Sequence, residues 1–130
     1  MEYVKSFRDL EVYKLSRQLS KEIFELSKKF PKEEMYSLTD QIRRSSRSVG
    51  AQIAEAWAKR NYEKHFISKL TDADGEQLET QHWIETSLDC SYISSNIANE
   101  FLERYFFIGK MLNSMMDKSE KFCKTTIKGK

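Results

Sequence analysis

Apolar residues recur at alternating spacings of three and four along four long stretches of this 130-residue chain. This spacing places them on one side of a helix, so each stretch is predicted to form an amphipathic helix that buries that side. The predicted helices cover about residues 8–29, 33–59, 62–91 and 95–122. With one proline and four glycines, the chain has too few turn-forming residues for a compact β fold.

The connections between these stretches are short, and residues typical of helix ends mark them. Pro31 is predicted to end the first helix, because proline disfavours helical geometry in the residue before it. Asn61 is a good N-cap for the third helix, and Ser94 or Ser95 is a good N-cap for the fourth. The sequence therefore predicts an all-α fold, a single antiparallel up-down-up-down four-helix bundle over residues 1–130.

The chain shows no apolar run of signal-peptide length near its start and none long enough to span a membrane. Its two cysteines, Cys90 and Cys123, lack CxxC spacing and have no nearby histidine. We interpret both cysteines as ordinary thiols in a reducing compartment. We therefore expect a soluble, cytoplasmic protein.

The second predicted helix has small residues at its centre, where Ser45, Ser46, Gly50 and Ala51 follow one another. A glycine in a helix interior costs up to about 1 kcal/mol relative to alanine. Close approach of a neighbouring helix or chain is the simplest way to offset that cost. These four residues are therefore predicted to be close-packing positions.

Two basic groups lie on and just beyond the same helix. They are Arg43, Arg44 and Arg47, which cluster over one turn, and then Lys59, Arg60 and Lys64. Arginine forks and spaced cations bind phosphate and give salt-dependent nucleic-acid binding. The same side chains could instead pair with carboxylates of another helix, and both interpretations stay open.

Charge and aromatic residues are distributed unevenly along the chain. Residues 61–94 carry seven acidic and two basic side chains, whereas every other helical segment is net basic. The uneven charge is either that of an ordinary solvated surface or that of two complementary surfaces that join subunits head to tail. A head-to-tail assembly closes into a ring if the rotation between subunits allows it.

Many aromatic residues also lie off the apolar stripes, so we predict a homo-oligomer. They are Tyr13, Phe24, Tyr36, Trp57, Trp83, Phe106 and Phe107.

Signals for an enzyme are weak. Glu79 and His82 match one Glu-x-x-His half of a di-iron site, but the second half is missing because Tyr62 precedes His65 by three residues. The carboxylates from Asp72 to Glu79 also fit a single solvated face. The sequence contains no phosphate-binding glycine loop and no nucleophile elbow. We predict no catalytic residues, no metal site and no cofactor.

Three segments resemble a family of small bacterial four-helix bundle proteins. The family is named for open reading frames in the intervening sequences of 23S ribosomal RNA genes, and its members were once labelled ribosomal-protein-like. The similar segments are "FRDLEVYKLSRQL" (7–19), "FPKEEMYSLTDQIRRSSRSVGAQIAEAWAKR" (30–60) and "KHFISKLTDADGEQLETQ" (64–81). The family's usual Asn-Ile-Ala-Glu-Gly is here the sequence Gln-Ile-Ala-Glu-Ala at residues 52–56, and its usual Ala-x-Gly-Ser is Ala-Asp-Gly-Glu at residues 73–76.

This resemblance implies a left-handed antiparallel bundle that assembles as a homopentamer and has no enzymatic activity. A related branch, the accessory variability determinant of diversity-generating retroelements, is a basic pentameric barrel that associates with a reverse transcriptase and nucleic acid. The resemblance implies that Arg43, Arg44 and Arg47 contact either a neighbouring subunit or RNA. Our main hypothesis is a non-catalytic oligomer that binds RNA or a nucleoprotein. The alternative is a purely structural assembly module, or a reverse-transcriptase accessory protein that reads no bases.

Overall fold

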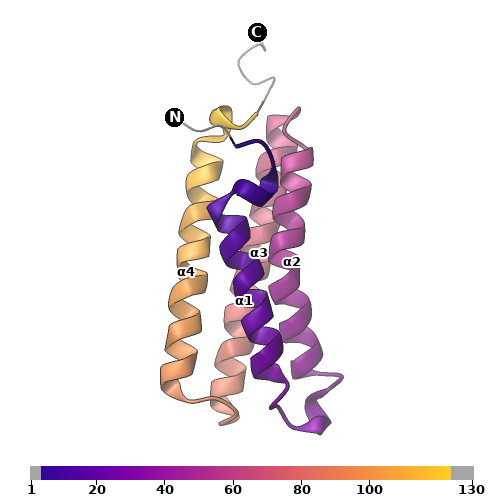
Figure 1. Ribbon diagram of the computed structural model, residues 1–130, viewed down its shortest axis with the longest axis vertical. Helices are drawn as coiled ribbons and strands as arrows, with labels where there is room; N and C mark the ends of the chain where they lie inside the picture. The colour runs from indigo at the N-terminus through magenta and orange to yellow at the C-terminus, as the bar shows by residue number, and fades with distance from the viewer. Residues whose placement is uncertain (1–3, 124–130) are drawn as a thin grey trace.

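The computed structural model describes residues 4–123, and within them four long α-helices lie side by side (Figure 1). They are α1 (Glu11–Ser27), α2 (Leu38–Ala58), α3 (Glu63–Asp89) and α4 (Ser95–Asp117). Three short 3-10 turns accompany them: η1 (Phe7–Asp9), η2 (Lys32–Glu34) and η3 (Ser119–Lys121). Residues 4–123 contain no strand. The predicted all-α four-helix fold is confirmed.

Successive helices run in opposite directions. In Figure 1 the α1–α2 and α3–α4 connections lie at one end of the bundle and the α2–α3 connection lies at the other. Among neighbouring long helices, contacts are most extensive between α2 and α3, and sparsest between α1 and α4. A bidentate ion pair links α1 to α4: Arg104 of α4 donates to both carboxylate oxygens of Glu22 of α1, at 2.8 and 2.7 Å.

The four predicted stripes meet in one core. Burying a large apolar side chain contributes about 1.5–3 kcal/mol, so these residues dominate the stability of the bundle. The large side chains that are fully buried there are Leu19, Ile23, Ile42, Val49, Ile53, Phe66, Leu70, Ile84, Tyr105, Ile108 and Leu112. The polar centre of the third stripe is buried with them, as Gln77 and Thr80.

The second helix begins later than predicted, at Leu38 rather than near residue 33. The segment before it is held by hydrogen bonds to a carboxylate: Glu34 accepts from the Ser37 hydroxyl at 2.7 Å and from the Leu38 amide at 3.3 Å. Tyr92, from the α3–α4 connection, donates its hydroxyl to the same carboxylate at 2.8 Å, which raises the pKa of Tyr92 to about 12. Glu34 thus supports the start of α2 from outside the helix.

Other helix ends also differ from the prediction. Leu10 is extended and separates η1 from α1, so the first helix starts at Glu11 rather than near residue 8. Tyr62, not Asn61, is the N-cap of α3. Ser94 caps α4 as predicted, since its hydroxyl accepts from the Ile97 amide at 3.2 Å. That helix ends at Asp117, short of the predicted residue 122.

Two glycines inside helices have opposite surroundings. At Gly109, which is buried in α4, a Cβ would lie 2.7 Å from Nε2 of Gln77. Gln77 cannot easily move aside, because its amide donates to Asp74 at 2.9 Å and accepts from Gln81 at 2.7 Å. At Gly75 on α3, a Cβ would meet nothing within 4 Å. Of these two glycines, Gly109 is therefore the one that a close approach of two helices requires.

These surroundings predict opposite effects of the same substitution. Gly75→Ala should raise the free energy of unfolding by about 0.5–1 kcal/mol, the gain in helix propensity alone. Gly109→Ala should lower it by about 1–3 kcal/mol, because the added methyl group overpacks the α3–α4 contact. Urea denaturation of both variants checks this. Equal stabilisation by the two substitutions would contradict the close contact.

Candidate nucleic-acid interface

The three arginines predicted to cluster on α2 point in two directions. Arg43 donates Nε to the Ser27 hydroxyl of α1 at 2.7 Å. Arg47, one turn later on the same side, also faces α1. Arg44 is rotated by about 100° from Arg43 and reaches α3 instead. The predicted group of three is therefore a pair plus a separate residue.

Arg44 is held by an ion pair within the subunit. Its guanidinium donates to Glu79 at 2.5 Å and to Glu76 at 3.3 Å, and Glu79 also accepts from the Trp83 indole at 3.0 Å. The hydrogen bond from Arg44 is the main reason that the pKa of Glu79 is lowered, and the same contact raises the pKa of Arg44. The ion pairs of Arg44 thus link α2 to α3 within the subunit.

Arg43 and Arg47 instead gather around an aromatic ring. Phe24 of α1 has the guanidinium carbons of Arg43 and Arg47 at 4.6 and 5.3 Å from its ring centre, and the amine of Lys28 at 4.9 Å. Lys28 also pairs with Glu25 at 3.4 Å. Within residues 4–123, neither arginine has a carboxylate partner. We call Phe24, Lys28, Arg43 and Arg47 the basic face.

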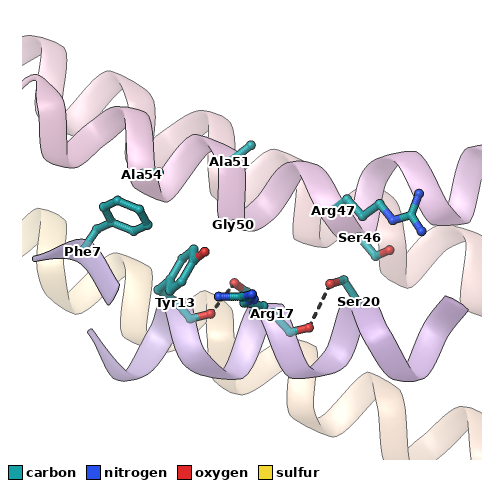
Figure 2. Close-up of a pocket in the computed structure, with 10 residues that line it drawn as sticks. Phe7, Tyr13, Arg17, Ser20, Ser46, Arg47, Gly50, Ala51 and Ala54 are labelled. Atoms are coloured by element: carbon teal, nitrogen blue, oxygen red, sulfur yellow. Dashed lines mark hydrogen bonds between the residues drawn. The ribbon is translucent and has the colours of Figure 1, made fainter. Parts of the chain in front are cut away.

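A groove of about 230 Å³ between α1 and α2 adjoins this face, and we call it the α1–α2 groove (Figure 2). Arg17 and Arg47 line it together with Phe7 and Tyr13, and no carboxylate is among its lining residues. The remaining lining is small: Ser16, Ser20, Ser46, Gly50, Ala51 and Ala54.

The residues predicted to allow close packing face three different surroundings. Ser45 is fully buried against α3, where it accepts a hydrogen bond from the Thr80 hydroxyl at 2.8 Å. Ser46 is buried, and Gly50 lies opposite Tyr13 and Ser16 of α1. Ala51 is exposed and is among the residues that line the α1–α2 groove.

The second basic group, Lys59, Arg60 and Lys64, lies at the α2–α3 connection, about 18 Å along α2 from Arg47. Arg60 stacks on Trp57 with its guanidinium carbon 3.7 Å from the ring centre, and it donates Nε to the Trp57 carbonyl at 2.8 Å. Lys59 and Lys64 are exposed. The two groups therefore do not form one patch.

Sequence reasoning missed several members of this surface. Phe24 was noted only as one of several off-stripe aromatics, although its i,i+4 spacing to Lys28 was visible. Arg17 and Phe7 carried no signal, because only the packing of α1 on α2 brings them to the groove.

No cluster of three potential metal ligands from His, Cys, Asp or Glu occurs in the described part of the chain. Glu79 is engaged by Arg44 and Trp83, and His82 lies exposed with its ring 4.6 Å from that of Trp83. Among the described helices, none has the length and apolar character needed to cross a membrane.

The chain is thus a small four-helix bundle protein with a basic, aromatic face on its first two helices. The chain belongs to the 23S rRNA-intervening sequence protein family, whose profile matches residues 8–114. It is also similar to a protein of unknown function from the S23 ribosomal protein family of Bacteroides thetaiotaomicron VPI-5482, whose crystal structure is known at 1.70 Å resolution. The two are 30% identical with a TM-score of 0.73 over 82% of this chain and 95% of that one. No curated protein matches the chain.

The Arg44 ion pair gives a pH-dependent prediction. Glu79→Gln should lower the free energy of unfolding at pH 7 by up to about 1 kcal/mol, the range for a partly exposed pair. Folding lowers the pKa of Glu79, so its contribution is present above the ordinary glutamate pKa and is lost as the pH falls through the folded value. The difference between variant and wild type should therefore shrink below about pH 4.

Urea denaturation across a pH series measures this difference. Glu103→Gln, at an exposed position of α4, is the control and should change stability by less than about 0.5 kcal/mol at every pH. A constant deficit for Glu79→Gln from pH 7 down to pH 3 would show that the ion pair is not its source.

Proposed function

We propose that this protein is a non-catalytic, homo-oligomeric four-helix bundle of the cytoplasm that binds RNA, or a nucleoprotein containing it, through the basic face. The observation that carries the proposal is the gathering of Arg43 and Arg47 over Phe24 with no carboxylate paired to either within residues 4–123. The association of the family name with 23S rRNA directs the choice to RNA.

The chemistry of the face suits a phosphate backbone. Guanidinium forks bind phosphate oxygens in a bidentate way, and each neutralised phosphate releases counterions. Arg44 contributes little to this surface, since two carboxylates of α3 already neutralise it. The proposed interface is therefore narrower on α2 than the sequence predicted, and it extends onto α1.

Exposed apolar side chains support the oligomer. Tyr36 is 92% exposed, Phe106 is 63% exposed, and Phe107 and Leu78 are each 54% exposed. So many large apolar side chains on one small domain are typical of a surface that another chain covers. We propose that copies of this chain cover them, in the ring of five that the family resemblance implies.

The arginine pair and Arg44 give a matched test. Arg43→Gln with Arg47→Gln should weaken binding of structured RNA at low salt, and should reduce the slope of log affinity against log salt by about 0.7–0.9 for each lost contact. Arg44→Gln removes one positive charge from the same helix and should leave that slope nearly unchanged, because Glu76 and Glu79 already pair with Arg44. Filter retention across a salt series provides the measurement. No retention at low salt would refute RNA binding, and retention indifferent to the double substitution would refute the basic face as its site.

A second function, a purely structural assembly module, is favoured by the exposed carboxylates of α3. Glu85 and Asp89 face solvent and could meet the basic face of a neighbouring subunit. In that case the double substitution should dissociate the oligomer in sedimentation velocity while helicity by circular dichroism stays intact. Dissociation without any RNA binding by the wild type would select this function over the first.

A further inference from the structure

The α1–α2 groove is hollow because its α2 side lacks side-chain bulk. Gly50, Ala51 and Ala54 follow one another along the wall (Figure 2). A Cβ at Gly50 would lie 3.3 Å from the Ser16 hydroxyl and 3.5 Å from the Tyr13 ring, so even one methyl group would narrow the groove. At about 230 Å³ it is smaller than the roughly 300–1,000 Å³ of pockets that enclose drug-sized ligands. It suits one flat ring.

Two aromatic rings form one part of the groove. Phe7 and Tyr13 meet edge to face, with their ring centres 4.9 Å apart. The Tyr13 hydroxyl has no hydrogen bond to any of residues 4–123. An aromatic ligand placed here would find apolar ring surface beside a free phenol group.

The hydroxyl groups of the lining are oriented as acceptors. Ser16, Ser20 and Ser46 each donate to a backbone carbonyl of their own helix, at 2.9, 2.9 and 3.1 Å respectively. Ser16 and Ser46 are only 1% exposed, whereas Ser20 is half-buried, so Ser20 is the hydroxyl whose oxygen can still accept from an N–H group of a ligand. Exocyclic amines and ring N–H groups of nucleobases are donors of this kind.

Charge at the groove is of one sign. Arg17 and Arg47 line it without a lining carboxylate, and Arg17 has no ion pair within residues 4–123. A concave surface lined by one sign of charge concentrates the oppositely charged ligand. The groove therefore combines an aromatic wall, a serine acceptor and two guanidinium groups that no carboxylate of residues 4–123 neutralises.

We propose that the α1–α2 groove holds one nucleotide of a single-stranded RNA, with its base against Tyr13 and its phosphates on Arg17 and Arg47. A base in a duplex is stacked and paired and cannot enter a groove between two helices, whereas an unpaired base can be splayed out onto aromatic side chains. This inference rests on the proposed function and gives it a preference: single-stranded segments bind more tightly than duplex.

The test fills the groove without changing charge. Ala54→Phe places a ring in the groove, and Ala58→Phe, on the same helix outside it, is the control. Fluorescence anisotropy with a single strand of about ten adenosines, and with an RNA duplex of equal length, measures affinity. Ala54→Phe should weaken single-strand binding about tenfold or more, the effect of losing one stacked base, and leave duplex binding unchanged. Ala58→Phe should change neither.

Arg17→Gln is a second variant, at an exposed position where folding is not at risk. It should weaken single-strand binding and lower its salt slope by about 0.7. If wild type binds both RNAs but neither Ala54→Phe nor Arg17→Gln lowers single-strand affinity, the groove proposal is wrong and the basic face still stands. If wild type binds neither RNA at low salt, the proposed function fails, and this inference fails with it.

Discussion

A hydrogen bond between two small, fully buried hydroxyl side chains, Ser45 and Thr80, joins α2 to α3 inside the apolar core. A buried polar group without a partner is costly, so this pair favours one rotation and one register of α2 on α3. With Ser45 turned to α3, the next residue, Ser46, turns towards α1. Arg43 and Arg47 follow it to that side.

One consequence is that α2 separates its own charges. On the α3 side, Arg44 meets two carboxylates, and that charge is neutralised within the subunit. On the α1 side, Arg43 and Arg47 meet an aromatic ring and a serine hydroxyl instead. Cation–ring contacts hold these side chains in place without cancelling their charge. Positive potential is therefore retained on the α1 side of α2.

Helical periodicity was sufficient to predict which face of each helix is buried, because the apolar stripes depend on local spacing alone. The helix ends were less predictable, since the start of α2 depends on Glu34, which is itself held by a tyrosine 58 residues away. The contacts of the three arginines could not be predicted for a similar reason. Adjacent residues on a helix point about 100° apart, and the residues that each arginine contacts belong to another helix. The close approach at Gly109 could not be predicted, because a glycine in a helical pattern does not show that the Gln77 side-chain amide of another helix lies against it.

The aromatic end of the α1–α2 groove is built partly on η1, a single 3-10 turn that lies ahead of the first long helix. Ser6 and Asp9 close this turn with a capping box, and Phe7 anchors it on Tyr13. A segment with so few contacts opens locally at a much lower free energy than the core helices. If the proposed nucleotide binds in the groove, its binding and the ordering of this segment favour each other by the same coupling free energy. Amide hydrogen exchange at the start of the chain would thus report on a binding event that takes place between two helices.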